Sequence, residues 1–321
     1  MEPSSARVDV ALDRELEQAQ AALLARFAPE TRVRRVRWSQ GETQLFELGS
    51  GTPLLYVHGG LGGAFEIVPI LGMLAENHRV LAVDRPGHGL ADPFDYRGVD
   101  FLDHARTFLG DILDALELTS VDIVANSMGA LWSASFAISE PGRVSRLALV
   151  GAPAGVRRRV PLQLVLLGLP LIGQRLGRHF LSNGTREGSR KFFAQVLVEH
   201  PERLDDLFLD VDVANARRNV DSMLGLIARV ADVRALGLRR DVILGDRWRA
   251  LTTQTLLVWG DRDVFAPPEV AEALAAKNPN IRLVRLSAAG HLPWIDDPES
   301  VIAEIERFLA TERRAAVEAV E

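Results

Sequence analysis

Residues 121–132, VDIVANSMGALW, carry the clearest indication of the fold. Their first half is a short apolar, β-branched run that predicts a buried strand, and their second half begins a helical pattern. Ala125 and Gly129 stand two positions before and after Ser127. A sharp strand-to-helix turn needs small residues there, because larger side chains would collide with neighbouring backbone, and it lifts the serine hydroxyl clear of the sheet. The stretch therefore predicts a nucleophile elbow. The alternative, on this motif alone, is that Ser127 only caps the helix.

Short apolar runs alternate with helical patterns on both sides of this stretch, which is typical of a mostly parallel sheet covered by helices. We therefore expect an α/β fold. The predicted strands are residues 33–38, 43–47, 54–58, 80–84, 121–126, 147–151, 255–259 and 282–286. The predicted helices are residues 12–27, 69–76, 101–116, 128–139, 268–276 and 299–310.

The alternation breaks over residues 154–250, which are helix-like and rich in leucine and arginine. A structureless loop of that length would be too long for a compact domain, so the segment predicts a helical insertion carried on top of the sheet. We expect three parts. They are an N-terminal helical extension at 1–30, an α/β core made of 31–153 and 251–321, and the helical insertion at 154–250.

A serine hydroxyl is a weak nucleophile without a neighbouring base, and the partners in an elbow of this kind follow the serine in the order acid, then histidine. Both occur after later predicted strands. Asp261 and Asp263 follow the strand at 255–259, and His291 follows the last strand, next to Gly290. Asp263 lies deeper in its loop and fits better as the group that orients His291, whereas Asp261 is expected to stabilise the turn through its own backbone.

A glycine-rich segment, HGGLGG at residues 58–63, follows the strand at 54–58. Such a turn lets backbone N–H groups approach a substrate oxygen, so Gly60 and Met128 are predicted to form an oxyanion hole. His58 is expected to be a buried hydrogen-bonding residue. Asp84 also falls near the offset of a ribose-binding acid, but the dinucleotide-binding pattern fails because Phe65 stands where its third glycine is needed.

Composition sets limits on the function. The chain has 321 residues, 47% of them hydrophobic, a net charge of −6 and no cysteine. The absence of cysteine excludes disulfides, thiolate catalysis and cysteine–zinc sites. The acidic balance argues against a nucleic-acid partner. The start lacks a signal-peptide pattern, and the longest apolar run, residues 161–173, is too short to span a bilayer. We expect a cytoplasmic enzyme without an integral membrane segment, metal or cofactor, and the oligomeric state stays open.

The motifs HGG, DRPGHG, NSMGA, WGDRDVFAP and AGHLPW, in this order, resemble the α/β-hydrolase superfamily. The resemblance covers the predicted core. It implies a catalytic triad of Ser127, Asp263 and His291, oxyanion amides at Gly60 and Met128, and a cap domain in the insertion. A serine at position 127 argues against the epoxide-hydrolase and haloalkane-dehalogenase branches, which are otherwise similar.

The substrate is expected to bind in an apolar pocket under the insertion. Candidate pocket residues are Leu61, Val264, Leu292 and Trp294, beside the apolar run at 161–173. Such a pocket favours a hydrophobic small-molecule ester, cleaved through an acyl-enzyme, although these side chains could instead pack the insertion onto the core.

Two alternatives remain. The elbow Asn-Ser-Met-Gly at 126–129 is similar to that of carbon–carbon bond hydrolases acting on ring-cleavage (meta-cleavage) products, whereas the loop after His291 is closer to esterases. The arginine that such hydrolases carry in their cap cannot be placed among the many arginines here. The alternative of another class is a ligand receptor built on a hydrolase fold.

Overall fold

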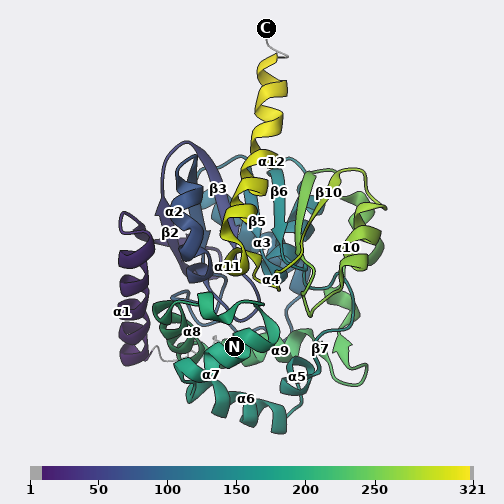
Figure 1. The fold of residues 1–321 in the computed structure, drawn as a ribbon. Helices are drawn as coiled ribbons and strands as arrows, with labels where there is room; N and C mark the ends of the chain where they lie inside the picture. The colour runs from purple at the N-terminus through teal and green to yellow at the C-terminus, as the bar shows by residue number, and fades with distance from the viewer. Residues whose placement is uncertain (1–8, 319–321) are drawn as a thin grey trace.

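The computed structural model describes residues 9–318, and the side chains up to residue 310. Residues 1–8 of the predicted extension and residues 319–321 of the predicted core lie outside the described residues. Within the described residues, the central sheet has eight strands (Figure 1). They are β1 (Arg32–Trp38), β2 (Gly41–Leu48), β3 (Thr52–Val57), β4 (His78–Val83), β5 (Val121–Ala125), β6 (Val144–Val150), β9 (Gln254–Gly260) and β10 (Ile281–Leu286).

The sheet is mostly parallel. Its strand order is β1-β2-β4-β3-β5-β6-β9-β10, and only the β1–β2 and β2–β4 pairs are antiparallel. Because the parallel strands are covered on both faces, they are nearly continuous runs of apolar residues. In β3, Leu55 and Val57 face one hydrophobic core while Leu54 and Tyr56 face the other, as the two-residue period of a strand requires.

Different helices cover the two faces of the sheet. The core on one face includes α3 (Phe101–Ala115), α4 (Ser127–Ser139) and α10 (Pro268–Ala275). The core on the other face includes α1 (Val10–Phe27), α2 (Val68–Ala75), α11 (Pro293–Asp296) and α12 (Pro298–Glu318). The parallel strands therefore lie between two helical layers, and their carboxyl ends form one edge of the sheet.

Between β6 and β9 the chain leaves the sheet and forms the inserted segment, residues 154–250, beneath the sheet in Figure 1. Its helices are α5 (Leu162–Leu167), α6 (Ile172–Ser182), α7 (Arg186–Val196), α8 (Asp206–Arg218) and α9 (Val220–Val230). A short hairpin of β7 (Ala231–Asp232) and β8 (Gly237–Leu238) and two 3-10 turns, Arg240–Val242 and Gly245–Ala250, follow.

The N-terminal helix is tied to the inserted segment. Helix α1 lies beside α8 (Figure 1), where Arg218 pairs with Asp13 at 2.5 Å and Arg217 pairs with Glu15 at 2.7 Å. Arg218 also donates to the Gly89 carbonyl oxygen at 2.9 Å. The predicted extension is therefore packed against the rest of the molecule, through charged partners that lie about 200 residues away along the chain.

The mostly parallel α/β sheet predicted from the sequence is confirmed. The six predicted helices also occur, and strand and helix ends shift by a few residues, except that α12 runs on to Glu318. The short elements α11, β7 and β8 had no counterpart in the prediction. No helix in the described range 9–318 has the length and apolarity needed to cross a membrane.

Candidate active site

Ser127 lies at the tip of the turn between β5 and α4. Its φ of +51° falls in the left-handed region that non-glycine residues rarely adopt, so the turn holds this residue in a strained conformation. The close approach of α4 to β3 explains Gly129, because a Cβ there would lie 2.1 Å from the Val57 carbonyl oxygen. Ala125 is fully buried, and its methyl group fits the turn.

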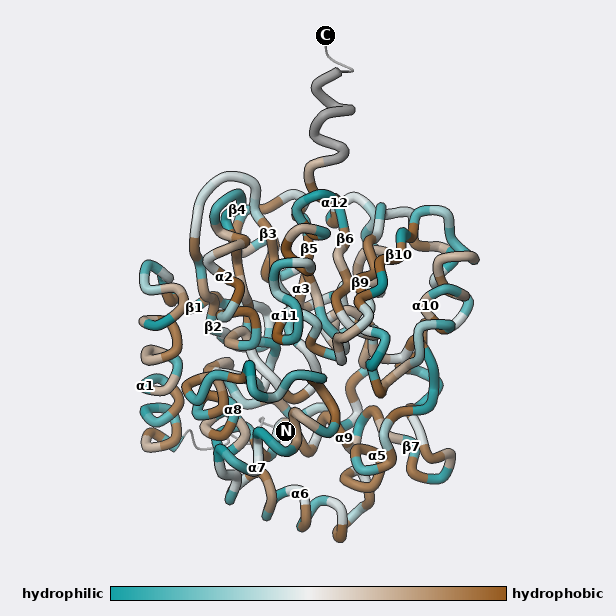
Figure 2. The backbone as a smooth tube through the Cα atoms, in the orientation of Figure 1, coloured by the Kyte–Doolittle hydropathy of each residue, from teal (hydrophilic) through white to brown (hydrophobic). Residues whose placement is uncertain are grey.

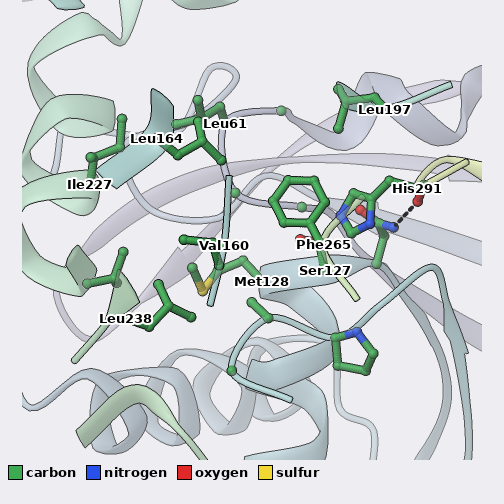
Figure 3. A pocket seen from close by; sticks show the side chains of 18 of the residues that line it. Leu61, Ser127, Met128, Val160, Leu164, Leu197, Ile227, Leu238, Phe265 and His291 are labelled. Carbon is green, nitrogen blue, oxygen red and sulfur yellow. Dashed lines mark hydrogen bonds between the residues drawn. The ribbon is translucent and has the colours of Figure 1, made fainter. Parts of the chain in front are cut away.

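Asn126 joins the serine turn to the histidine loop. Its side-chain amide donates to the Val150 carbonyl oxygen at 2.6 Å and to the His291 carbonyl oxygen at 3.1 Å. One buried side chain therefore fixes three strand ends relative to one another. As a result, Ser127 and His291 line the same cavity, as Figure 3 shows.

His291 is held by Asp263. The Nδ1 atom of His291 lies 2.8 Å from Oδ2 of Asp263, and both side chains are buried. The carboxylate also accepts the N–H of Ala152 at 2.8 Å and that of Phe265 at 2.9 Å, which fixes its orientation. With Nδ1 donating to the carboxylate, Nε2 of a neutral imidazole is the basic nitrogen. Within the described residues this buried Nε2 has no hydrogen-bond partner, so it is free to accept a proton.

Asp261 has a different environment. Its carboxylate accepts from Nε of Arg285 at 2.8 Å, in a partly exposed ion pair on the outer side of β10. The sequence-based expectation was that its side chain stabilises the turn through its own backbone, but its recorded partner is Arg285. Only Asp263, of the two candidate acids, contacts His291 in this structure.

The histidine loop is anchored by the inserted segment. Gly290 donates its N–H to Asp296 at 2.7 Å, and the same buried carboxylate accepts the N–H of His200 at 2.7 Å. Leu292 donates its N–H to the Leu197 carbonyl oxygen at 2.8 Å. The chain on each side of His291 is therefore linked to residues 197–200, which follow α7. Leu292 is bonded to this segment directly, and Gly290 shares the Asp296 carboxylate with it.

The Gly59–Gly60 peptide bond has a fixed orientation. Its carbonyl oxygen, on Gly59, accepts from the guanidinium of Arg85 at 2.5 Å and lies 2.9 Å from Nδ1 of His58. The next carbonyl, on Gly60, accepts from Arg85 at 2.9 Å and lies 2.7 Å from Nε2 of His88. Because the N–H of a trans peptide points away from its carbonyl oxygen, these contacts set the direction of the Gly60 N–H. That N–H has no partner recorded between residues 9 and 318.

A second N–H without a partner recorded in the described range 9–318 belongs to Met128, the second residue of α4. The first bond inside the helix is made by Ala130, whose N–H donates to the Asn126 carbonyl oxygen at 3.1 Å. The N–H of Met128 precedes it and belongs to the donors that a helix N-terminus leaves free. These donors and the helix dipole favour negative charge at this point.

Arg85 is a fully buried cation without an ion pair recorded in the described part of the chain. Its guanidinium carbon lies 4.9 Å from the ring centroid of Trp132, and its Nε and Nη1 atoms have no hydrogen-bond partner among these residues. Burial lowers the pKa of Arg85, yet an arginine stays protonated in proteins. Arg85 donates hydrogen bonds to the carbonyl oxygens of Gly59 and Gly60, so its positive charge lies directly behind the glycine-rich loop.

The cavity around Ser127 is mainly apolar. Leu61 and Leu292, two of the four candidate pocket residues, line it. Most of its other lining side chains are also apolar, and Figure 3 labels Met128, Val160, Leu164, Leu197, Ile227, Leu238 and Phe265 among them. The ring of Phe265 lies 4.1 Å from that of His291, measured between centroids.

The other two candidate pocket residues lie elsewhere. Val264 is 47% exposed and does not line the cavity, because the loop turns the next side chain, Phe265, inward. Trp294 is buried in the core, where its Nε1 donates to the Glu66 carbonyl oxygen at 2.9 Å. The indole N–H of Trp294 is thus hydrogen-bonded to a backbone oxygen, and the residue packs in the core and does not line the cavity.

Two carboxyl groups stand in the mainly apolar wall of the cavity. Glu66 is buried beside the glycine-rich loop, accepts the Gly59 N–H at 3.3 Å, and occupies the space that a Cβ on Gly62 would need. Burial raises the pKa of Glu66 to about 8. Asp212, on α8, accepts from Ser189 at 2.6 Å, and burial raises its pKa to about 6. Near neutral pH, Glu66 is therefore mainly uncharged and Asp212 mainly ionised.

The sequence analysis does not identify four residues that hold the site in place, namely Arg85, Glu66, Asn126 and Asp296. The motif DRPGHG contains Arg85, and an arginine directly after a strand that ends beside the glycine-rich turn could have indicated it. Glu66 has a weaker signal, a lone acid within the apolar stretch AFEIVPIL at 64–71. The described residues contain no group of three or more histidine, aspartate or glutamate side chains that could hold a metal ion.

The chain is similar to a known protein family and to several known hydrolases. The model of the "Alpha/beta hydrolase family" matches residues 54–304. A curated relative, 2-hydroxy-6-oxononadienedioate/2-hydroxy-6-oxononatrienedioate hydrolase 2 of Pseudomonas putida, is 28% identical over 278 residues, which are 82% of this chain and 91% of that protein.

Solved structures with the same fold include carboxylesterase CesB (YbfK) from Bacillus subtilis, with a TM-score of 0.74, 19% identity and coverage of 94% of this chain and 99% of that one. Another is the meta-cleavage product hydrolase CumD from Pseudomonas fluorescens IP01, with a TM-score of 0.69, 18% identity and coverage of 86% and 97%. The family match spans more than half of the sequence and includes the serine turn, the acid loop and the histidine loop. The chain therefore belongs to the α/β-hydrolase family and is a hydrolase.

Proposed function

We propose that the protein is a carboxylesterase that cleaves esters of hydrophobic small molecules through an acyl-enzyme, with Ser127 as nucleophile, His291 as base and Asp263 as the acid that orients it. The observation that supports this proposal is that Ser127 and His291 line one cavity with mainly apolar walls. Nδ1 of His291 is bonded to Asp263, and its Nε2 has no hydrogen-bond partner among the described residues. An apolar site with few polar groups suits an ester with an apolar acyl or alkyl part.

In the first half of the reaction, Oγ of Ser127 attacks the acyl carbonyl carbon while Nε2 of His291 takes the hydroxyl proton. The resulting tetrahedral intermediate collapses as the imidazolium gives that proton to the leaving alkoxide, which departs as an alcohol. In the second half, His291 takes a proton from water, which attacks the acyl-serine and releases the acid. Asp263 remains ionised throughout and stabilises the imidazolium.

The negative oxygen of the intermediate is stabilised by the N–H groups of Gly60 and Met128. The Gly59 carbonyl oxygen, which belongs to the same peptide group as the Gly60 N–H, accepts from Arg85. A chain of hydrogen bonds therefore runs from the guanidinium through this peptide group to the oxyanion. Hydrogen bonds in such chains polarise one another, and the fixed cation costs no reorganisation during the reaction. Arg85 is thus a positioning residue, acting through Gly60.

Arg85→Met is expected to lower kcat about 10- to 100-fold, because it removes the cation that orients and polarises an oxyanion donor, with KM changing little. Arg85→Lys should recover part of the loss. The inhibition constant of a trifluoromethyl ketone, whose adduct carries an oxyanion, should rise by the same factor as kcat falls. Unfolding is measured in parallel, and a loss of activity that follows stability, with unchanged ketone affinity, would contradict this role.

We further propose that residues 154–250 act as a cap over the site. Support comes from the lining of the cavity, to which α5 contributes Leu164 and Val165 and α9 contributes Leu226, Ile227 and Val230. The core contributes the reacting groups, so substrate choice would be set mainly by the inserted segment.

Carbon–carbon bond hydrolysis is the second candidate, and two observations favour it. The curated relative from Pseudomonas putida is named as a dioate hydrolase, and Arg157 and Arg159 line the cavity, where an arginine could bind a substrate carboxylate. Against it, Nε of Arg157 is bonded to the Phe265 carbonyl oxygen at 2.6 Å, and Asp212 would repel an anion. We therefore place the ester reaction first.

A panel of p-nitrophenyl esters with graded acyl length, run beside a vinylogous dienoic diketone of the ring-cleavage type, tests the choice. We expect a higher kcat/KM for the esters, with an optimum at an apolar acyl chain. Faster cleavage of the diketone would favour the second candidate instead. Binding with at most a single turnover of every ester would indicate a receptor.

A further inference from the structure

The inserted segment carries a row of exposed large apolar side chains, which we call the ridge. Its members are Leu162 (50% exposed) and Leu166 (43%) on α5, Leu171 (79%) just before α6, and Ile172 (68%), Leu176 (51%) and Phe180 (67%) on α6. Residues spaced by four lie on one face of a helix, so Ile172, Leu176 and Phe180 form a single stripe. Figure 2 shows this edge of α6 in brown, at the end of the molecule opposite to α12.

Helix α6 packs with its small residues inward and its large apolar residues outward. Gly173 and Gly177 are buried. A Cβ on Gly173 would lie 2.3 Å from the Leu166 carbonyl oxygen, and one on Gly177 would lie 2.5 Å from the side chain of Leu224. The contact with α5 and α9 is therefore too close for larger side chains. A helix that only packs onto a water-soluble body would place its large apolar residues in that contact.

The part of the chain that carries the ridge, residues 154–186, is rich in arginine and contains no acidic residue. It includes six arginines, in a chain whose net charge is −6. Three of these arginines pair with acids outside this stretch, Arg158 with Asp232, Arg178 with Asp221 and Arg186 with Asp206.

Arg159 and Arg175 are exposed and have no carboxylate partner recorded within the described residues. Arg175 lies on α6 itself, one position before Leu176 of the ridge. Apolar residues bordered by unpaired arginines are the combination that binds in the interface of an anionic bilayer.

The ridge and the cavity share helix α5. Leu164 and Val165 point into the cavity, while Leu162 and Leu166, on the opposite side of the same short helix, belong to the ridge. A bilayer in contact with the ridge would therefore be separated from the active-site cavity by one helix.

We propose that the ridge docks the protein onto the surface of an anionic lipid bilayer, with Ile172, Leu176 and Phe180 inserted among the acyl chains and Arg175 against the headgroups. The charge pattern favours this partner over a second copy of the chain. Pairing two ridges would bring their arginines together, where like charges repel, whereas anionic headgroups neutralise them. Binding needs no catalysis, so this proposal is tested independently of the proposed function.

The test is flotation of the full chain with unilamellar vesicles of phosphatidylcholine alone or of phosphatidylcholine mixed with phosphatidylglycerol. We expect binding to the mixed vesicles that weakens as salt is raised, and much weaker binding to phosphatidylcholine alone. The variant Ile172→Ser/Phe180→Ser should bind the mixed vesicles at least about tenfold more weakly, since it removes two inserting side chains. Arg175→Gln should bind about fivefold more weakly.

The matched control is Val10→Ser/Val33→Ser, which changes two comparably exposed apolar residues (67% and 54%) on α1 and β1, and it should bind as the unchanged protein does. Hydrolysis of a water-soluble short ester should be equal in all variants, because none of the changed residues lines the cavity. Two results would overturn the proposal. One is vesicle binding that the ridge substitutions leave unchanged. The other is no vesicle binding together with a dimer, seen by light scattering, that Ile172→Ser/Phe180→Ser dissociates.

Discussion

Ser127→Ala is expected to lower the kcat for short p-nitrophenyl esters by about 10⁴- to 10⁶-fold, because it removes the atom that forms the acyl-enzyme. Stability should be preserved. The hydroxyl of Ser127 makes no recorded hydrogen bond within the described chain, and alanine keeps the Cβ and removes only the hydroxyl. Initial rates and thermal unfolding, measured on the same preparation, check both expectations.

The matched control is Ser133→Ala on the same helix. Ser133 is fully buried and its hydroxyl also lacks a partner among the described residues, but it does not line the cavity. Its substitution should leave kcat unchanged. A Ser127→Ala protein that keeps most of its activity would remove Ser127 from the mechanism.

Asp263→Asn is expected to lower kcat by about 10⁴-fold. An amide NH₂ facing Nδ1 of His291 would favour the tautomer protonated on Nε2, which cannot accept the serine proton. The substitution also disturbs the local bonding. Ala152 and Phe265 donate N–H groups to the two oxygens of Asp263, and an asparagine can accept only one of them. We therefore expect a stability loss of about 1–3 kcal/mol beside the loss in rate.

Asp261→Asn provides the comparison. It weakens a partly exposed ion pair with Arg285, which is worth at most about 1 kcal/mol of stability, and it touches no group in the cavity. Its kcat should stay close to that of the unchanged protein. A larger rate loss in Asp261→Asn than in Asp263→Asn, with both proteins folded, would assign the acid to the other residue.

The sequence was sufficient to predict the core, because each part of it has a local signal. Apolar runs such as 54–58 and 121–126 are continuous since the strands are buried on both faces. Gly129 had a reason that could be stated in advance, namely the close approach of helix and strand. The contact between Asp263 and His291 also followed from strand order and loop position, since carboxyl ends of parallel strands meet at one edge of the sheet and Asp263 lies deeper in its loop than Asp261.

Features that depend on packing could not be predicted in this way. Val264 and Phe265 are neighbours of similar character, and only the path of the loop decides which of them faces the cavity. Trp294 was expected in the pocket because it lies near His291 in sequence, but its indole N–H finds a partner in the core. The outward orientation of the apolar stripe on α6 likewise requires knowing that its glycines form the contact with α5 and α9.

Arg85 illustrates a further limit. A buried, unpaired cation is unfavourable by itself, so the place of Arg85 after its strand could indicate its neighbourhood but not its burial behind the glycine-rich loop. Its position is recognised only when the two carbonyls that it contacts are known. The same holds for Glu66, whose carboxyl fits the space left by the missing side chain of Gly62.

The proposed mechanism requires Ser127 to carry the acyl group during turnover. The most direct test is mass spectrometry of the protein, quenched with acid while it turns over a hindered ester such as p-nitrophenyl pivalate, whose acyl-enzyme is expected to hydrolyse slowly. We predict a mass increase of one pivaloyl group, located by fragmentation on Ser127, and no such increase in Ser127→Ala. Release of p-nitrophenol in many turnovers without any adduct, or with the acyl group on another residue, would contradict the mechanism.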